Sequence, residues 1–261
     1  MSDRRERQKQ ARAAAREAER KAAARRELRR RVTVGLGLGA SVALVLLLLG
    51  TFSSSDETDI PDALAAFREQ PTACDASPPE PARAMEFEAP INQAIRADAT
   101  VTATLVTSCG TIVVDLDNAE FPQTVNNFVF LARNGYYDGS AFHRIAPDFV
   151  IQGGDPTASG TGGPGYTITD EVPPAGFFYE EGVVAMANAG RGNTGSQFFI
   201  VSGEGAAALN PTFNVLGRVI DGFDVVERIN GVPTRQQAGG RERSYPTESV
   251  YLESVTITVE R

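Results

Sequence analysis

Two segments of this chain bring together the side chains that could do chemistry. Residues 142–155 read FHRIAPDFVIQGGD, and residues 186–200 read MANAGRGNTGSQFFI. The first segment contains Arg144, whose guanidinium is always charged and presents several N–H groups in a fixed fork, and the amide of Gln152. The second segment adds further amide side chains and aromatic rings. Such residues can donate hydrogen bonds to a polar group without transferring a proton.

Proton-transfer and metal chemistry are poorly supplied by the sequence. The chain has one histidine, His143, and two cysteines, so it has no cluster of His or Cys that would hold a metal. Gly160, Gly162 and Gly165 match the spacing of a dinucleotide-binding fingerprint. However, Pro164 removes an amide donor there, and no strand-to-helix unit surrounds the glycines. We therefore predict no cofactor and no metal.

Each candidate residue also has an ordinary structural interpretation. Asp155, Asp170 and Glu171 could form a carboxylate pair, but acidic residues in such stretches more often belong to turns and loops. Arg144 could form a surface ion pair, and Gln152 could satisfy buried backbone groups. The aromatic residues taken singly fit a core. It is the joint spacing of the two segments that favours a functional site.

The elements around these segments predict a mainly β domain. Alternating apolar residues predict strands at 101–105 and 112–116, joined by a turn at 108–111. Further short strands are expected at residues 141–145, 149–152, 182–186, 198–202 and 255–259. Helical spacing predicts helices at 122–134 and 223–229. Many strands with two helices in about 165 residues suggest a closed barrel capped by helices.

In order, spacing and separation, the two segments resemble the signature of the cyclophilin family of peptidyl-prolyl cis/trans isomerases. The resemblance extends from about residue 100 to the C-terminus. It implies a closed eight-stranded antiparallel barrel capped by two helices, with a shallow proline-binding groove on one face. It also implies that the chain rotates X-Pro peptide bonds in exported proteins and so assists their folding. The alternative is a slow or inactive proline-peptide binding module that acts as an envelope chaperone.

The resemblance also implies a role for individual residues. Arg144 and Gln152 are the implied catalytic residues, with Arg144 donating a hydrogen bond to the proline nitrogen of the twisted amide. The implied substrate-binding residues are Phe149, Val150, Gly160, Ala187, Asn188, Ala189, Gln197, Phe199, Leu209 and Phe213. The implied partners are proline-containing peptides and unfolded exported proteins, and neither a metal nor a cofactor is implied.

Three positions depart from the best-known members of the family. Val150 stands where those members have a methionine, which shortens an apolar wall, and Phe213 stands at the usual histidine position. Ala208 stands at the usual tryptophan position, and the chain contains no tryptophan. Because that indole donates to cyclosporin in the sensitive members, we predict weak cyclosporin binding.

The N-terminal residues predict a membrane anchor. Residues 1–31 contain thirteen Arg or Lys and five acidic residues, although the whole chain has a net charge of −8. Residues 32–52 carry no charge and are numerous enough to cross a bilayer as a helix. A cleaved signal peptide is the alternative, but no convincing cleavage site follows the long apolar run. We expect an uncleaved, single-pass signal anchor in the cell membrane, with a cytoplasmic N-terminus and no role in binding nucleic acid.

The remaining residues are then extracytoplasmic. Residues 53–96 are rich in proline and predict a stalk with at most a short helix near 63–68, followed by the isomerase domain at 97–261. Cys74 and Cys109 both lie on the exported side, where a disulfide can persist, so we predict that they pair. Two unpaired buried thiols are the alternative.

Overall fold

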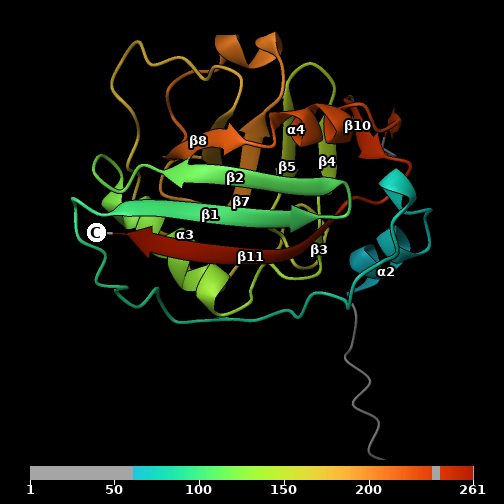
Figure 1. Ribbon diagram of the computed structural model, residues 1–261, viewed down its shortest axis with the longest axis horizontal. Coiled ribbons are helices and arrows are strands. Elements are labelled where there is room, and N and C mark those ends of the chain that lie inside the picture. Colours follow the sequence, from blue (N-terminus) through green and yellow to red (C-terminus); the bar gives the residue numbers. More distant parts are fainter. Residues whose placement is uncertain (1–60, 237–241, 261) are drawn as a thin grey trace, which may run out of the picture. The chain divides into compact units, whose positions relative to one another are not determined.

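The structure describes the chain from residue 61 onward, apart from a short internal stretch. It is a computed structural model that describes residues 61–236 and 242–260 (Figure 1). The predicted basic segment 1–31 and the predicted anchor 32–52 lie outside the described residues. Within the described ranges, none of the helices combines the length and the apolar character that a membrane crossing requires. The compact unit that contains the described residues is Thr58–Arg261.

Nine strands form one sheet in the order β3-β11-β1-β2-β8-β6-β7-β5-β4, and all neighbouring pairs are antiparallel. The strands are β1 (Thr100–Thr107), β2 (Gly110–Leu116), β3 (Ser140–Ala141), β4 (Arg144–Ala146), β5 (Val150–Gly153), β6 (Val183–Asn188), β7 (Thr194–Val201), β8 (Val215–Asp221) and β11 (Tyr251–Glu260). A separate pair consists of β9 (Thr234–Gln236) and β10 (Arg243–Pro246). The helices are α2 (Asp62–Arg68), α3 (Pro122–Arg133) and α4 (Phe223–Asn230), with 3₁₀ turns at Ala73–Asp75 and Glu204–Ala208.

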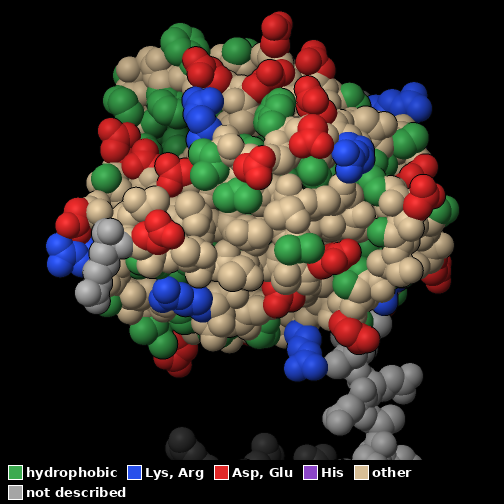
Figure 2. Space-filling model, in the orientation of Figure 1, with side chains coloured by type: hydrophobic (Ala, Val, Ile, Leu, Met, Phe, Trp, Pro, Cys, Tyr) green, Lys and Arg blue, Asp and Glu red, His purple; other side chains and the backbone are tan. Residues whose placement is uncertain are grey.

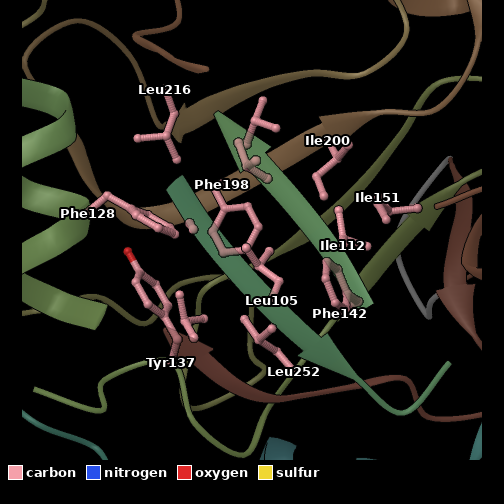
Figure 3. Packing of buried hydrophobic residues seen from close by; sticks show 14 of the residues in the cluster. Leu105, Ile112, Phe128, Tyr137, Phe142, Ile151, Phe198, Ile200, Leu216 and Leu252 are labelled. Atoms are coloured by element: carbon pink, nitrogen blue, oxygen red, sulfur yellow. The ribbon is translucent and has the colours of Figure 1, made fainter. Parts of the chain in front are cut away.

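The core of the domain lies between the sheet and helix α3. Alternate residues of β1 and β2, among them Leu105 and Ile112, are fully buried, as the alternating pattern predicted. Phe198 of β7 meets Phe128 of α3 edge to face, with ring centroids 5.7 Å apart, and Phe128 stacks on Tyr137 (Figure 3). These ring contacts join β7 to α3 and to the segment after it, so they hold the sheet and the helix together.

Both predicted helices of the isomerase domain are confirmed. Helix α3 begins at Pro122, where the missing N–H costs no helical hydrogen bond, and it buries Val125, Phe128 and Val129 on one side. Helix α4 begins after Gly222, whose φ of 80° suits a residue without a side chain. The short helix expected near 63–68 is also present, as α2.

The prediction of a closed eight-stranded barrel is wrong in strand number and in closure. The strand expected at 141–145 is two strands, because the chain changes partners at Phe142: its N–H donates to the Val250 carbonyl beyond the end of β3. Strand β3 pairs with β11, whereas β4 pairs with β5. The two halves of the expected strand therefore become the two ends of an open nine-stranded sheet.

Residues 61–96, predicted as a stalk, follow the surface of the domain where they are described. The Ala73 N–H donates to the Ser249 carbonyl over 3.0 Å, and the Phe87 N–H donates to the Pro164 carbonyl over 2.8 Å. The predicted disulfide is present: Cys74 is bonded to Cys109 in the β1–β2 connection, with the two Cα atoms 5.2 Å apart. This segment is thus bonded covalently to the domain.

Acidic side chains are numerous on one face of the domain (Figure 2). Figure 2 shows them distributed over one face, with basic side chains lying singly between them. On that face the described residues form no continuous basic patch of the kind that tracks a phosphate backbone.

Candidate active site

Arg144 stands at one end of a chain of polar side chains that crosses three strands. Arg144 in β4 lies opposite Gln152 in β5, and its Nη1 donates to the Gln152 Oε1 over 3.1 Å. The Gln152 Nε2 in turn donates to the Gln197 Oε1 over 3.0 Å, and the Gln197 Nε2 donates to the Gly162 carbonyl over 3.0 Å. Each amide is oriented by its neighbours, so this series of hydrogen bonds fixes the position of the guanidinium.

The guanidinium of Arg144 has two further contacts. Its Cζ lies 5.5 Å from the centroid of the Phe149 ring, which favours a cation over the ring face. Its Nε and Nη2 each donate to a carboxylate oxygen of Glu242 over 2.8 Å. Glu242 is a site residue that the sequence did not reveal, because it lies 98 positions from Arg144 and outside both motif segments. The hydrogen bonds from Arg144 hold the pKa of Glu242 below its usual range, so the pair is ionised at neutral pH.

Apolar site residues gather beside this polar chain in a cluster separate from the main core. Of the predicted binding residues, those that pack in this cluster are Phe149, Val150, Ala187, Phe199, Leu209 and Phe213. The Phe199 and Phe213 rings meet edge to face, with centroids 5.4 Å apart. Phe199 is 4% exposed and forms the floor, whereas Phe149, Leu209 and Phe213 are only partly buried. The arrangement leaves apolar surface that an incoming ring can contact.

Tyr179 fixes the position of Phe213 and was not predicted. Its hydroxyl donates to the Phe213 carbonyl over 2.8 Å and accepts a hydrogen bond from the Phe213 N–H over 3.0 Å. Burial raises the pKa of Tyr179, so the hydroxyl keeps the proton that it donates. A buried tyrosine that satisfies both backbone groups of one residue orients that residue toward the cluster.

A cavity of about 710 Å³ continues the site on the other side of Gln152. Six predicted residues line it: Gln152, Gly160, Ala187, Asn188, Ala189 and Gln197. Asn188 is held in place because its Nδ2 donates to the Thr212 carbonyl over 3.0 Å. Glu86, from the segment that precedes the sheet, contributes the only carboxylate among the lining residues. The predicted residues therefore divide between the apolar cluster and this cavity, with Ala187 in both and Arg144 at their polar border.

The loop that forms one wall of the cavity is organised by Asp155, which the sequence analysis considered only as a possible member of a carboxylate pair. This carboxylate is fully buried and accepts hydrogen bonds from the backbone N–H groups of Thr157, Gly160 and Gly162. A Cβ at position 162 would lie 2.0 Å from the Asp155 Oδ1, so only glycine fits there. The glycines of this loop thus surround a buried carboxylate.

His143, next to Arg144 in the chain, points into the protein. It is 8% exposed, and burial lowers the pKa of its imidazole, with a smaller opposing effect from Asp155. It is therefore neutral at pH 7. Among residues 61–236 and 242–260, His, Cys, Asp and Glu side chains form no group of three that could hold a metal ion.

Comparison with known proteins agrees with this geometry. Residues 102–257 match the family model described as cyclophilin type peptidyl-prolyl cis-trans isomerase/CLD. The chain is 43% identical over 177 residues to peptidyl-prolyl cis-trans isomerase A of Mycobacterium tuberculosis, covering 61% of this chain and 93% of that protein. It is 45% identical over 136 residues to human peptidyl-prolyl cis-trans isomerase-like 1, covering 51% of this chain and 81% of that protein.

Solved structures give the same result. A cyclophilin type isomerase of Cryptosporidium parvum superimposes with a TM-score of 0.54 at 29% identity, covering 61% of this chain and 98% of that one. The same protein, crystallised in the presence of the dipeptide Ala-Pro, also gives a TM-score of 0.54. The fold and these matches thus define the class of the protein as a mainly β isomerase of X-Pro peptide bonds. The chain belongs to the cyclophilin family, and its activity is that of a peptidyl-prolyl cis/trans isomerase.

Proposed function

We propose that Arg144 is the residue that stabilises the transition state of X-Pro rotation in this groove. The observation that carries the proposal is the position of its guanidinium, fixed by Gln152 and adjacent to the ring of Phe149. Resonance gives the peptide bond a rotation barrier of about 18–20 kcal/mol. As the amide twists, its nitrogen becomes pyramidal and gains a lone pair that accepts a hydrogen bond. A fixed N–H donor binds that state better than either planar form.

The rest of the groove binds the substrate on either side of the rotating bond. Phe149, Val150, Phe199, Leu209 and Phe213 enclose the proline ring, and the backbone of Asn188 holds the preceding residue in an extended conformation. An acceleration of about 10⁵ needs roughly 7 kcal/mol of preferential binding of the transition state. One charged donor in a partly desolvated groove supplies about 3–4 kcal/mol, and orientation of the bound peptide supplies the remainder. The Ala-Pro dipeptide named for the Cryptosporidium protein supports proline-peptide binding here.

An isomerisation assay tests this function directly. We expect the full chain, purified in a non-ionic detergent, to accelerate the cis-to-trans rotation of an Ala-Pro test peptide at nanomolar to micromolar enzyme concentration. We expect kcat/KM to fall about 100-fold or more in Arg144→Ala and by less in Arg144→Lys, which would separate the contribution of the donor fork from that of the charge. Binding of the peptide without any acceleration by folded protein would favour the alternative of a binding module that acts as a chaperone.

We also propose that the isomerase works on proteins outside the cytoplasm while anchored to the cell membrane. Residues 32–52 are the proposed single-pass anchor, and residues 1–31 the cytoplasmic topology signal. The Cys74–Cys109 disulfide supports export, because disulfides persist in oxidising compartments. Protease added to intact cells should digest residues 53–261 and spare residues 1–31. Protection of the isomerase domain in intact cells would contradict the proposal.

Weak cyclosporin binding is the last part of the proposed function. Ala208 ends the 3₁₀ turn Glu204–Ala208 beside Leu209, and its methyl group offers no hydrogen-bond donor. Titration of the isomerase with cyclosporin should therefore require far more inhibitor than a tryptophan-containing family member does.

A further inference from the structure

The pair of strands β9 and β10 places a carboxylate against the proposed catalytic arginine. Strand β10 lies beside β4, which carries Arg144, and Glu242 immediately precedes β10. The strand pair is well anchored: the Arg243 Nε donates to the Thr234 carbonyl over 2.7 Å, and Arg235 stacks on the Tyr245 ring at 4.3 Å. Tyr245 packs in turn against Phe67 of α2. Glu242 is thus held by ordered structure on its C-terminal side.

The geometry of the Arg144–Glu242 pair leaves a defined part of the guanidinium available. Glu242 accepts from Nε and Nη2, and Gln152 accepts from Nη1. Three of the five guanidinium N–H groups are therefore engaged, and one on each Nη has no partner among the described residues. A substrate can accept these hydrogen bonds without displacing Glu242. The carboxylate and the amide hold the guanidinium plane from two sides.

From this we propose that Glu242 is a positioning residue, which fixes the plane of Arg144 so that its free N–H groups face the peptide bond that rotates. The inference rests on the proposed role of Arg144. An arginine side chain has several rotatable bonds and loses considerable rotamer freedom when it is fixed. Without Glu242, Gln152 and the Phe149 ring are the described contacts that restrain the guanidinium, and a larger part of that freedom must be lost in the transition state.

The same pair has an ordinary interpretation as a surface salt bridge, which predicts different results. Arg144 and Glu242 side chains are 27% and 48% exposed, and exposed ion pairs contribute little to stability. A surface salt bridge would therefore leave both stability and rate nearly unchanged when broken. A positioning residue would leave stability nearly unchanged but reduce the rate.

The chain contains a matched control for this comparison. Arg96 and Asp98 form the same two-pronged pair, with Nε and Nη2 each donating over 2.8 Å, on residues that are 71% and 69% exposed. Neither residue lines the cavity or belongs to the apolar cluster. Asp98→Ala removes an equivalent carboxylate away from the groove.

The test is a double-mutant cycle on the isomerisation of the Ala-Pro peptide by the full chain. We expect Glu242→Ala to lower kcat/KM about 3- to 10-fold, mainly through kcat, and Glu242→Gln to recover part of the loss because it keeps one acceptor oxygen. In the Arg144→Ala background, Glu242→Ala should have no further effect, because the two residues act through one interaction. Asp98→Ala should be silent, and the thermal midpoints of all these variants should agree.

Three results would overturn the proposal. An unchanged or increased rate in Glu242→Ala, while Arg144→Ala is strongly slowed, would remove the role of Glu242 and leave the proposed function intact. An equal loss from Glu242→Ala in both backgrounds would show that Glu242 acts independently of Arg144. Full activity of Arg144→Ala would instead contradict the proposed function itself.

Discussion

The main core and the apolar cluster of the site, here called the groove cluster, are both built from aromatic and branched side chains, but they differ in how completely those side chains are buried. In the core, Phe198 is fully buried and contacts rings from α3 and from the segment after it. In the groove, Phe149 and Phe213 are left partly exposed around the buried Phe199. The core therefore has its apolar partners within the chain, whereas the groove has apolar surface left for a ligand. Neighbouring phenylalanines of one strand, Phe198 and Phe199, point to these two environments.

Truncation of Phe198 should have the largest effect on stability. We expect Phe198→Ala to lower the free energy of unfolding by about 3–5 kcal/mol, because it removes a fully buried ring and leaves a cavity in the core. Chemical denaturation followed by circular dichroism measures this. Activity per folded molecule should be retained, since the side chain points away from the groove. A stability within 1 kcal/mol of wild type would show that this ring is not part of a tightly packed core.

Loss of the disulfide should be the next largest effect. The bond closes a segment with a sequence separation of 35 residues, and replacing Cys74 and Cys109 with serine should cost about 3–4 kcal/mol in the chain-entropy model. The Cys74→Ser, Cys109→Ser double variant is compared with wild type by denaturation under oxidising conditions. The bond lies at the β1–β2 connection, outside the groove cluster, so kcat/KM should not change. A fall in kcat/KM without unfolding would indicate that the segment before the sheet supports the groove.

Truncation of Phe213 should lower activity more than stability, whereas truncation of Phe198 should lower stability and leave activity unchanged. We expect Phe213→Ala to lower kcat/KM about tenfold, equivalent to about 1.4 kcal/mol of transition-state binding, because the proline ring loses an apolar contact. The free energy of unfolding should fall by less than in Phe198→Ala, since the side chain is only partly buried. The same two assays applied to both variants measure the contrast. Equal losses of stability would remove the distinction between the two clusters.

The pH dependence of stability tests the environment of a single buried side chain, His143. Burial depresses the pKa of His143 in the folded protein. As the pH falls, the unfolded chain therefore takes up a proton on His143 at a higher pH than the folded protein does. Stability is therefore fully present above the unfolded pKa of about 6.5 and falls as the pH drops below it, by at most about 1.4 kcal/mol per pH unit. We expect His143→Gln to flatten the stability profile between about pH 6.5 and 5. A wild-type profile that is flat over this interval would contradict the neutral, buried state of His143.

The sequence predicted the parts of the fold that local pattern determines. Strands β1 and β2 alternate without interruption, and helix α3 has proline at its first position, so the predicted bounds lie within two residues of those in the structure. Strand β8 was not predicted, because Gly217 interrupts its alternation. The division of residues 141–145 between β3 and β4 depends on which strand each half meets, and no local pattern encodes that choice.

Most of the predicted site residues lie in the two motif segments, and the resemblance to the family added Gly160, Leu209 and Phe213. The structure brings the predicted residues into one cluster and one adjoining cavity. Glu242 and Tyr179 could not be predicted, since each acts on a residue far away in sequence through a contact that only the tertiary fold creates. Asp155 does lie in a motif segment. Its role depends on burial among backbone N–H groups, which the spacing of residues does not reveal.

We propose that Arg144 contributes to catalysis and not to the stability of the fold. The most direct test measures, for one preparation of Arg144→Ala, both the isomerisation of an Ala-Pro peptide and the free energy of unfolding, with Arg96→Ala as the control. We predict that kcat/KM falls about 100-fold or more while the free energy of unfolding changes by less than about 1 kcal/mol. A variant that keeps its full rate, or that loses rate only as it unfolds, would contradict the claim.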